Sequence, residues 1–187
     1  MVESAIIAII AYLIGSINFS VILSRKMAGF DVREKGSGNA GTTNMLRSVG
    51  KKAAAITLIC DILKGVVAIL IAMLMNKIFK DSNGALLVQI AGVAVILGHT
   101  FPIFFKFKGG KGVATSLGVL IMSNWQIGLI CLVFALILII LTQMVSVGSI
   151  AAAILYPVLT LFIPQNYIIP GNYIIYSVIL AVIIVFN

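Results

Sequence analysis

Long apolar stretches alternate with short polar ones along the chain. The apolar runs cover 5–23, 53–76, 85–105, 113–123, 125–142, 144–163 and 173–186. A helix needs roughly 20 apolar residues to cross the hydrocarbon core of a bilayer. The pattern therefore predicts an all-α integral membrane protein with about seven transmembrane helices. The expected range is five to seven, because the run at 113–123 is short enough for a re-entrant or tilted segment.

The composition supports the membrane prediction and argues against a soluble protein and a nucleic-acid-binding protein. Of the 187 residues, 61% are hydrophobic and 10% are charged, which is more apolar surface than a soluble domain of this length can bury. The net charge of +8 would suggest nucleic acid in a soluble protein, but the cations lie between apolar runs, so no nucleic-acid partner is expected. Cys60 and Cys131 lie inside apolar runs without C-x-x-C spacing, which predicts neither disulfides nor a metal site.

The basic residues predict an orientation. The polar segment 24–52 contains seven Lys and Arg residues and the segment 106–112 contains three. By the positive-inside rule both segments are cytoplasmic, which places the N-terminus outside. Residues 1–187 are expected to form a single polytopic domain. The final apolar run stops at Asn187 after about 14 residues and has no basic anchor. The span length and the charge rule together predict a chain cut short at its C-terminus.

The first basic segment has the composition of an anion-binding loop. KGSGNAGTTNMLR, at 35–47, combines three glycines with small hydrogen-bonding side chains and ends in Arg47. Glycine allows successive backbone N–H groups to converge, and hydroxyls, amides and arginine add hydrogen bonds to phosphate oxygens. A flexible solvated loop is the alternative. The side chains and glycine expected to contact phosphate here are Gly38, Asn39, Thr43 and Asn44.

The second basic segment, KFKGGKGVAT at 106–115, precedes an apolar run. A helix beginning there would direct its free N–H groups and positive dipole end at the same anion. The segment does not match G-x-x-x-x-G-K-[ST], so a nucleoside triphosphatase is not expected. The residues expected to bind phosphate here are Lys108, Gly109, Gly110, Lys111, Gly112 and Thr115.

Polar residues inside the apolar runs form a third group. Asp61 and Lys64 are three residues apart on one helical face, which favours a structural ion pair over substrate contact. Asn18 with Ser16 is interpreted as a hydrogen bond between helices. His99, the only histidine, ends an apolar run beside the second basic segment and is a candidate acid or base as well as an ordinary packing residue. The acid of an H-x-x-x-x-D acyltransferase motif is absent, because Phe104 stands in its place.

These motifs resemble one known family. GSGNAGTTNMLR at 36–47 and GHTFPIFFKFKGGKGVAT at 98–115 are similar to the bacterial acyl-phosphate:glycerol-3-phosphate acyltransferases (PlsY), as are Gly15–Ser16 and DILKG at 61–65. The resemblance implies a multi-pass enzyme of the bacterial inner membrane whose active site faces the cytoplasm. It also implies transfer of a fatty acyl group from acyl phosphate to the 1-hydroxyl of glycerol 3-phosphate, which gives lysophosphatidate and phosphate.

The resemblance also assigns roles. In the family, the serine and arginine that match Ser37 and Arg47 are required for activity, and the glycines that match Gly109 to Gly112 belong to the glycerol-phosphate loop. No cofactor and no obligate protein partner are implied. The family's third motif, with a histidine and an asparagine after the last span, has no counterpart here because the sequence ends at Asn187.

Acyl phosphate is already activated, so such an enzyme mainly orients two anions and stabilises an oxyanion. Direct attack by the glycerol hydroxyl is expected, with Arg47, Lys108 and Lys111 holding phosphate charge. Ser37 has no base in its motif and is expected to donate a hydrogen bond rather than act as a nucleophile. His99, the histidine of the third motif and substrate phosphate remain open as proton acceptors.

Two other functions stay open at this point. A transporter or channel for an organic phosphate would also bind anions at basic loops beside broken helices, although no inverted repeat is present. A membrane scaffold protein would use the same loops to contact anionic lipid.

Overall fold

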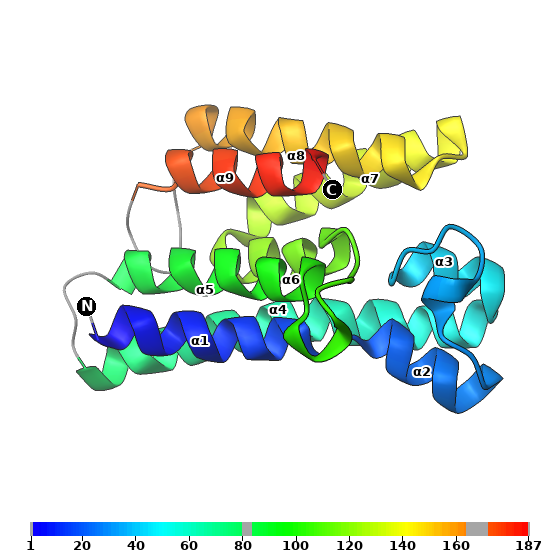
Figure 1. The fold of residues 1–187 in the computed structure, drawn as a ribbon. Helices are drawn as coiled ribbons and strands as arrows, with labels where there is room; N and C mark the ends of the chain where they lie inside the picture. Colours follow the sequence, from blue (N-terminus) through cyan, green and yellow to red (C-terminus); the bar gives the residue numbers. More distant parts are fainter. Residues whose placement is uncertain (1, 80–83, 164–171, 187) are drawn as a thin grey trace.

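The chain folds into a bundle of helices that run roughly along one axis (Figure 1). The computed structural model describes residues 2–79, 84–163 and 172–186. Its elements are α1 Val2–Ser16, α2 Phe19–Ala28, η1 Val32–Glu34, α3 Thr42–Ser48, α4 Lys51–Phe79, α5 Gly84–Thr100, η2 Ile103–Phe105, α6 Val113–Ser123, α7 Trp125–Thr142, α8 Val145–Phe162 and α9 Ile174–Val185. The predicted all-α fold is confirmed for these residues.

Five helical stretches are long and apolar enough to cross a membrane: 2–28, 51–79, 84–105, 125–142 and 145–162. Helices α6 and α9 are apolar but shorter, with 11 and 12 residues. At 1.5 Å per residue α6 extends about 16 Å, roughly half the hydrocarbon core. The number of crossings and the outside position of the N-terminus stay predictions. Residues 80–83 and 164–171, like Asn187, lie outside the described residues.

The apolar run at 5–23, predicted as one span, forms two helices rather than one. The helix stops after Ser16 and a new one begins at Phe19, with Asn18 as the N-cap. The Asn18 side-chain oxygen accepts hydrogen bonds from Val21 N at 3.2 Å and from Ser20 Oγ at 2.7 Å. Because these local bonds compete with the helical pattern, the chain breaks here. The interpretation of Asn18 as a contact between helices is therefore wrong.

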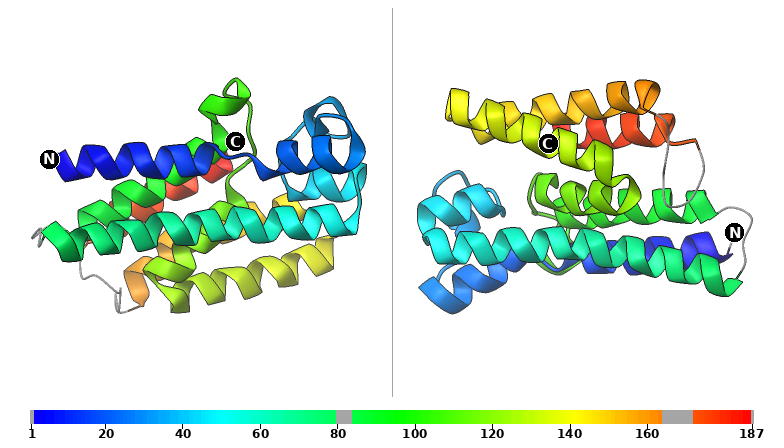
Figure 2. Two further views of the ribbon diagram at one scale, coloured as in Figure 1. Left: turned by 90° about the horizontal axis from the view of Figure 1, so that it is seen from below. Right: turned by 180° about the vertical axis from the view of Figure 1, so that it is seen from behind.

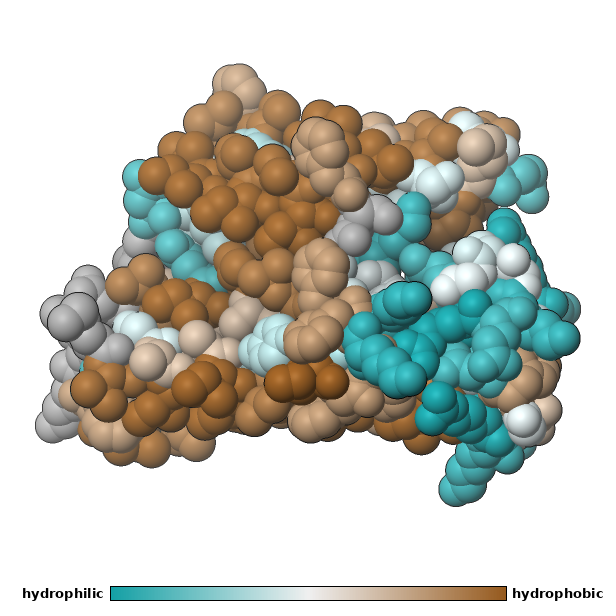
Figure 3. Space-filling model, viewed as in Figure 1, coloured by the Kyte–Doolittle hydropathy of each residue, from teal (hydrophilic) through white to brown (hydrophobic). Residues whose placement is uncertain are grey.

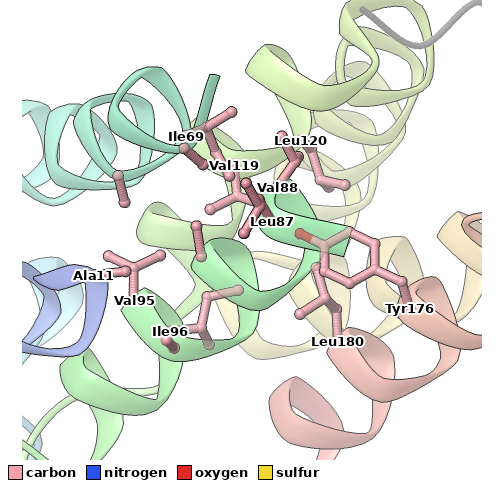
Figure 4. Packing of buried hydrophobic residues seen from close by; sticks show 14 of the residues in the cluster. Ala11, Ile69, Leu87, Val88, Val95, Ile96, Val119, Leu120, Tyr176 and Leu180 are labelled. Atoms are coloured by element: carbon pink, nitrogen blue, oxygen red, sulfur yellow. The ribbon is translucent and has the colours of Figure 1, made fainter. Parts of the chain in front are cut away.

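The bundle has two layers. Helices α1, α4 and α5 form one layer, α7, α8 and α9 form the other, and α6 lies between them (Figures 1 and 2). The buried core draws on several helices, with Ile69 from α4, Val95 from α5 and Val119 from α6. Tyr176 and Leu180 of α9 reach across to this cluster (Figure 4). The core holds the helices that carry the polar site in fixed register.

Glycines allow two pairs of helices to approach closely. A methyl group on Gly15 of α1 would collide with the backbone of Val95 in α5, and one on Gly98 would collide with Tyr12 O. Helices α4 and α6 meet in the same way, through Gly65 and Gly118. Small residues at such crossings are typical of membrane helices, where packing supplies much of the association energy. The first crossing brings α1 against the end of α5 that carries His99, and the second brings the part of α4 that carries Lys64 against the start of α6.

Hydrophilic residues are unevenly distributed over the surface of the bundle. Apolar side chains cover most of the face in Figure 3, and the larger group of hydrophilic residues lies over α2, α3 and the segment before α6, with a smaller group at the left of the view. Both basic segments lie at the end with the larger group, opposite the N-terminus of α1 (Figure 1). The structure therefore brings together the two loops that the sequence separates.

Candidate active site

The first loop is shaped by Asn44. Its side-chain nitrogen donates hydrogen bonds to Val32 O at 2.8 Å, Lys35 O at 3.0 Å and Asn39 O at 3.0 Å. Its oxygen accepts from Ser37 N at 3.1 Å and Ser48 Oγ at 3.3 Å. Gly36 and Gly38 have positive φ angles of 58° and 73°, a backbone conformation that residues other than glycine rarely adopt. The buried Asn44 side chain thus forms hydrogen bonds mainly with the backbone of its own loop.

The second loop folds back onto the end of α5. Gly109 N donates to Thr100 O at 3.0 Å, and Gly110 N donates to His99 O at 3.1 Å. A side chain at Gly109 would collide with His99 O, so only glycine permits this approach. Gly112, with φ of 80°, then turns the chain into α6. The loop therefore sits directly over His99.

The start of α6 offers polar groups without partners. No side chain caps this helix, and the first helical N–H groups have no partner within the helix itself. Thr115 Oγ1, Ser116 Oγ and Thr100 Oγ1 are buried and make no hydrogen bond within the described part of the chain. Because buried hydroxyls normally have partners, this region has the chemistry of a site that binds an anion.

The two loops are joined to each other. Ala40 N donates to Gly109 O at 3.3 Å. The Arg33 guanidinium donates to Phe105 O at 2.8 Å and to Lys108 O at 3.0 Å, and it lies 5.9 Å from the centre of the Phe105 ring. A single rim therefore runs from the first loop to the second.

Arg33 is held by Asp31. Arg33 Nε and Nη2 donate to the two carboxylate oxygens of Asp31 at 3.0 Å and 2.7 Å, and Arg25 donates to the same carboxylate at 2.8 Å. The hydrogen bonds from Arg33 lower the pKa of Asp31 from 3.8 to about 2. This bidentate pair fixes the guanidinium so that its third nitrogen reaches the second loop.

The Asp31 carboxylate is expected to stabilise the folded protein in a defined pH window. Because its pKa is lower in the folded state, the stabilisation is full above pH 3.8 and is lost as the pH falls toward about 2. Thermal unfolding in detergent should show Asp31→Asn melting below the wild type at pH 7, and the difference should shrink by pH 2.5. Glu34→Gln, which alters an exposed neighbouring carboxylate, is the control. A difference between Asp31→Asn and wild type that stays constant with pH would contradict the expected role.

A buried polar cluster lies under the second loop. Lys64 Nζ forms an ion pair with Asp61 Oδ1 at 3.0 Å and lies 2.8 Å from His99 Nδ1. The predicted Asp61–Lys64 ion pair is thus present. The other ring nitrogen of His99 faces Gly110, where a methyl group would collide with Nε2 and would lie 2.7 Å from Ala40 O. His99 therefore connects the buried cluster to the junction of the two loops.

The predicted site residues divide by exposure. Ser37, Gly38, Arg47, Lys108 and Lys111 are exposed, whereas Asn39, Thr43 and Gly109 are half-buried. The buried ones are Asn44, His99, Gly110, Gly112 and Thr115. The structure brings His99, Gly109 and Gly110 into contact, and Ser37 is tied to Asn44 through its backbone. Arg47, on the last turn of α3, forms no ion pair with any described residue.

Two features were missed at the sequence level. The Asp31–Arg33 pair was treated only as part of a basic segment, although an acid amid so many cations was a usable signal. The contact of Lys64 with His99 joins residues 35 positions apart, and no local pattern announces it. Among the described residues, no group of three His, Cys, Asp or Glu side chains could hold a metal ion.

Comparison with known proteins shows extensive similarity. The family described as "Glycerol-3-phosphate acyltransferase" matches residues 5–187. A glycerol-3-phosphate acyltransferase of Thermoanaerobacter pseudethanolicus is 44% identical over 180 residues, which cover 96% of this chain and 85% of that protein. One from Clostridioides difficile is 40% identical over 161 residues, covering 86% of this chain and 78% of the relative.

Solved structures are similar as well. The glycerol 3-phosphate form of PlsY (YgiH), an integral membrane glycerol 3-phosphate acyltransferase, superposes with a TM-score of 0.85 at 36% identity. The match covers 98% of this chain and 86% of that one. Its lysophosphatidic acid form gives a TM-score of 0.83 at 34% identity, with the same coverage.

Proposed function

The chain belongs to the glycerol-3-phosphate acyltransferase family, and from this premise we propose that it moves a fatty acyl group from acyl phosphate to the 1-hydroxyl of glycerol 3-phosphate. The products are lysophosphatidate, for phospholipid synthesis, and phosphate. The observation that carries the proposal is the joined rim of two basic loops above His99. Family membership favours an acyltransferase over an organic-phosphate carrier.

The rim suits a reaction between two phosphate compounds. Arg47, Lys108 and Lys111 are exposed cations that are available to hold phosphate charge. The start of α6, with the Thr115 hydroxyl, adds uncapped backbone N–H groups. We assign glycerol 3-phosphate to the second loop and its α6 terminus, and the reacting acyl phosphate to the first loop, near Ser37 and Arg47.

The proposed step is a direct transfer. The C1 hydroxyl oxygen attacks the acyl carbonyl carbon, the bond from that carbon to the phosphate oxygen breaks, and the hydroxyl proton ends in the released hydrogen phosphate. Because acyl phosphate is a mixed anhydride, the protein mainly supplies orientation and charge stabilisation. Ser37 donates a hydrogen bond in this scheme. An acyl-enzyme on Ser37, found after incubation with acyl phosphate alone, would contradict it.

Several side chains of the first loop have supporting roles. Asn44 keeps the backbone around Gly38 and Asn39 in its curved form, so its contribution to phosphate binding is through the loop's shape. Thr43, in the first turn of α3, and Asn39 are half-buried at the same rim. We propose that the loops face the cytoplasm at a bacterial inner membrane, where both water-soluble glycerol 3-phosphate and a lipid donor can reach them.

The donor is testable directly. Purified protein is given glycerol 3-phosphate with acyl phosphate, acyl coenzyme A and acyl-carrier-protein thioester as competing donors, each carrying a distinguishable acyl chain. Mass spectrometry of the lysophosphatidate should show the chain from acyl phosphate in large excess. Preference for a thioester chain would overturn the donor assignment and leave the acceptor assignment standing.

A further inference from the structure

Lys64 lies where three helices meet. Its ammonium group is almost fully buried and has four polar atoms within 3.2 Å: Gly15 O, Ile17 O, Asp61 Oδ1 and His99 Nδ1. A protonated amine supplies three hydrogens and accepts none. Its three hydrogens match Gly15 O, Ile17 O and His99 Nδ1, while Asp61 Oδ1 neutralises its charge as an ion-pair partner.

The two carbonyls come from the break between α1 and α2. In a continuous helix, Gly15 O and Ile17 O would accept from N–H groups four residues ahead, but Val21 N is bonded to Asn18 Oδ1 instead. Lys64 Nζ donates to them at 3.0 Å and 3.2 Å. A cation at the C-terminal end of α1 also complements the helix dipole. The break and the lysine thus depend on each other.

The same amine defines the state of His99. Asp61 Oδ1 lies 3.6 Å from His99 Nδ1, too far for a good hydrogen bond, whereas Lys64 Nζ lies at 2.8 Å. Because the ammonium group only donates, Nδ1 must accept. A neutral imidazole whose Nδ1 accepts carries its proton on Nε2. That proton points at the junction of Ala40 and Gly110.

We propose that Lys64 is a positioning residue that fixes His99 as the tautomer with its proton on Nε2, and thereby makes His99 a hydrogen-bond donor toward the loop junction rather than a base. The tautomer follows from the short Lys64–His99 distance and the positive charge of Lys64 beside Asp61, whereas its catalytic effect rests on the proposed function. In this state, neither ring nitrogen is free to take the proton of the glycerol hydroxyl. The acceptor of that proton is then another group.

The chain's one histidine makes the tautomer directly measurable. With ¹⁵N in the imidazole ring, nitrogen–proton correlation spectra of the detergent-solubilised protein at pH 7.5 should show a proton on Nε2 and a pyridine-type Nδ1. In Lys64→Met this preference should be lost, and the spectrum should show a mixture of tautomers. Lys52→Met, which removes an exposed cation of α4, should leave the spectrum unchanged.

A double variant guards against loss of folding. Lys64→Met leaves the Asp61 carboxylate buried without its ion-pair partner, so Asp61→Asn/Lys64→Met, in which both charges are removed, is measured as well. It should also lose the Nε2 preference, and its kcat/KM should fall by about 10- to 100-fold, the size seen when a partner that fixes the tautomer of a functional histidine is removed. A wild-type spectrum with the proton on Nδ1 would overturn the inference, as would an unchanged tautomer in both variants. Because these spectra need no substrate, they test the tautomer of His99 independently of the proposed reaction.

Discussion

Arg47→Ala is expected to lower kcat/KM for glycerol 3-phosphate by about 10²- to 10³-fold while the protein remains folded. Arg47 projects from the last turn of the short helix α3 and is exposed, and it has no ion-pair partner among the described residues. Its guanidinium is therefore free to bind phosphate, and its removal leaves the developing phosphate charge without a preorganised partner. The folded state loses no ion pair.

The measurement compares steady-state kinetics of wild type, Arg47→Ala and Arg47→Lys, with melting temperatures recorded for each. Arg47→Lys should recover part of the activity, because lysine keeps the charge but not the bidentate geometry. Lys26→Ala, which removes an exposed cation from the last turn of α2, is the matched control and should stay close to wild type. An Arg47→Ala protein with more than half of wild-type activity would contradict the proposed role.

Gly110→Ala should reduce kcat/KM at least about 100-fold, the size expected when reacting groups are displaced by roughly 1 Å. The added methyl group would collide with His99 Nε2 and would lie 2.7 Å from Ala40 O. The imidazole cannot easily retreat, because Lys64 lies 2.8 Å from its other nitrogen. The two loops must therefore separate where they now touch.

Gly29→Ala is the matched control for this variant. Gly29 has a φ of 76° and open space around its Cα, so alanine there is strained but meets no neighbour. It should lower the melting temperature slightly and leave kcat/KM unchanged. If Gly110→Ala is as active as Gly29→Ala, the junction of the loops is not part of the reaction site.

Hydropathy and glycine content were enough to predict much of this architecture. Apolar runs of helical length have few alternatives in a bilayer, so every predicted run contains a helix. The break at Asn18 was missed because an asparagine in an apolar run fits both a buried hydrogen bond and a cap. Only the positions of Val21 N and Ser20 Oγ decide between them.

The site was predictable in composition but not in connection. Glycines beside cations indicated two anion loops, and the charge pattern placed both at one membrane face. That Arg33 joins them depends on the reach of one guanidinium across 72 residues, to Phe105 O. The pairing of Lys64 with His99 likewise depends on how α4 packs against α5. Such contacts come from tertiary packing and leave no local periodicity.

The central claim is that the joined loops catalyse transfer between two phosphate compounds, and the stoichiometry of the reaction tests it most directly. Purified protein is incubated with acyl phosphate and glycerol 3-phosphate, and phosphate and lysophosphatidate are both quantified. We expect the two products in equal amounts, neither above background when one substrate is omitted, and both reduced together in Arg47→Ala. Phosphate release without glycerol 3-phosphate, or lysophosphatidate formation that persists in Arg47→Ala, would contradict this account.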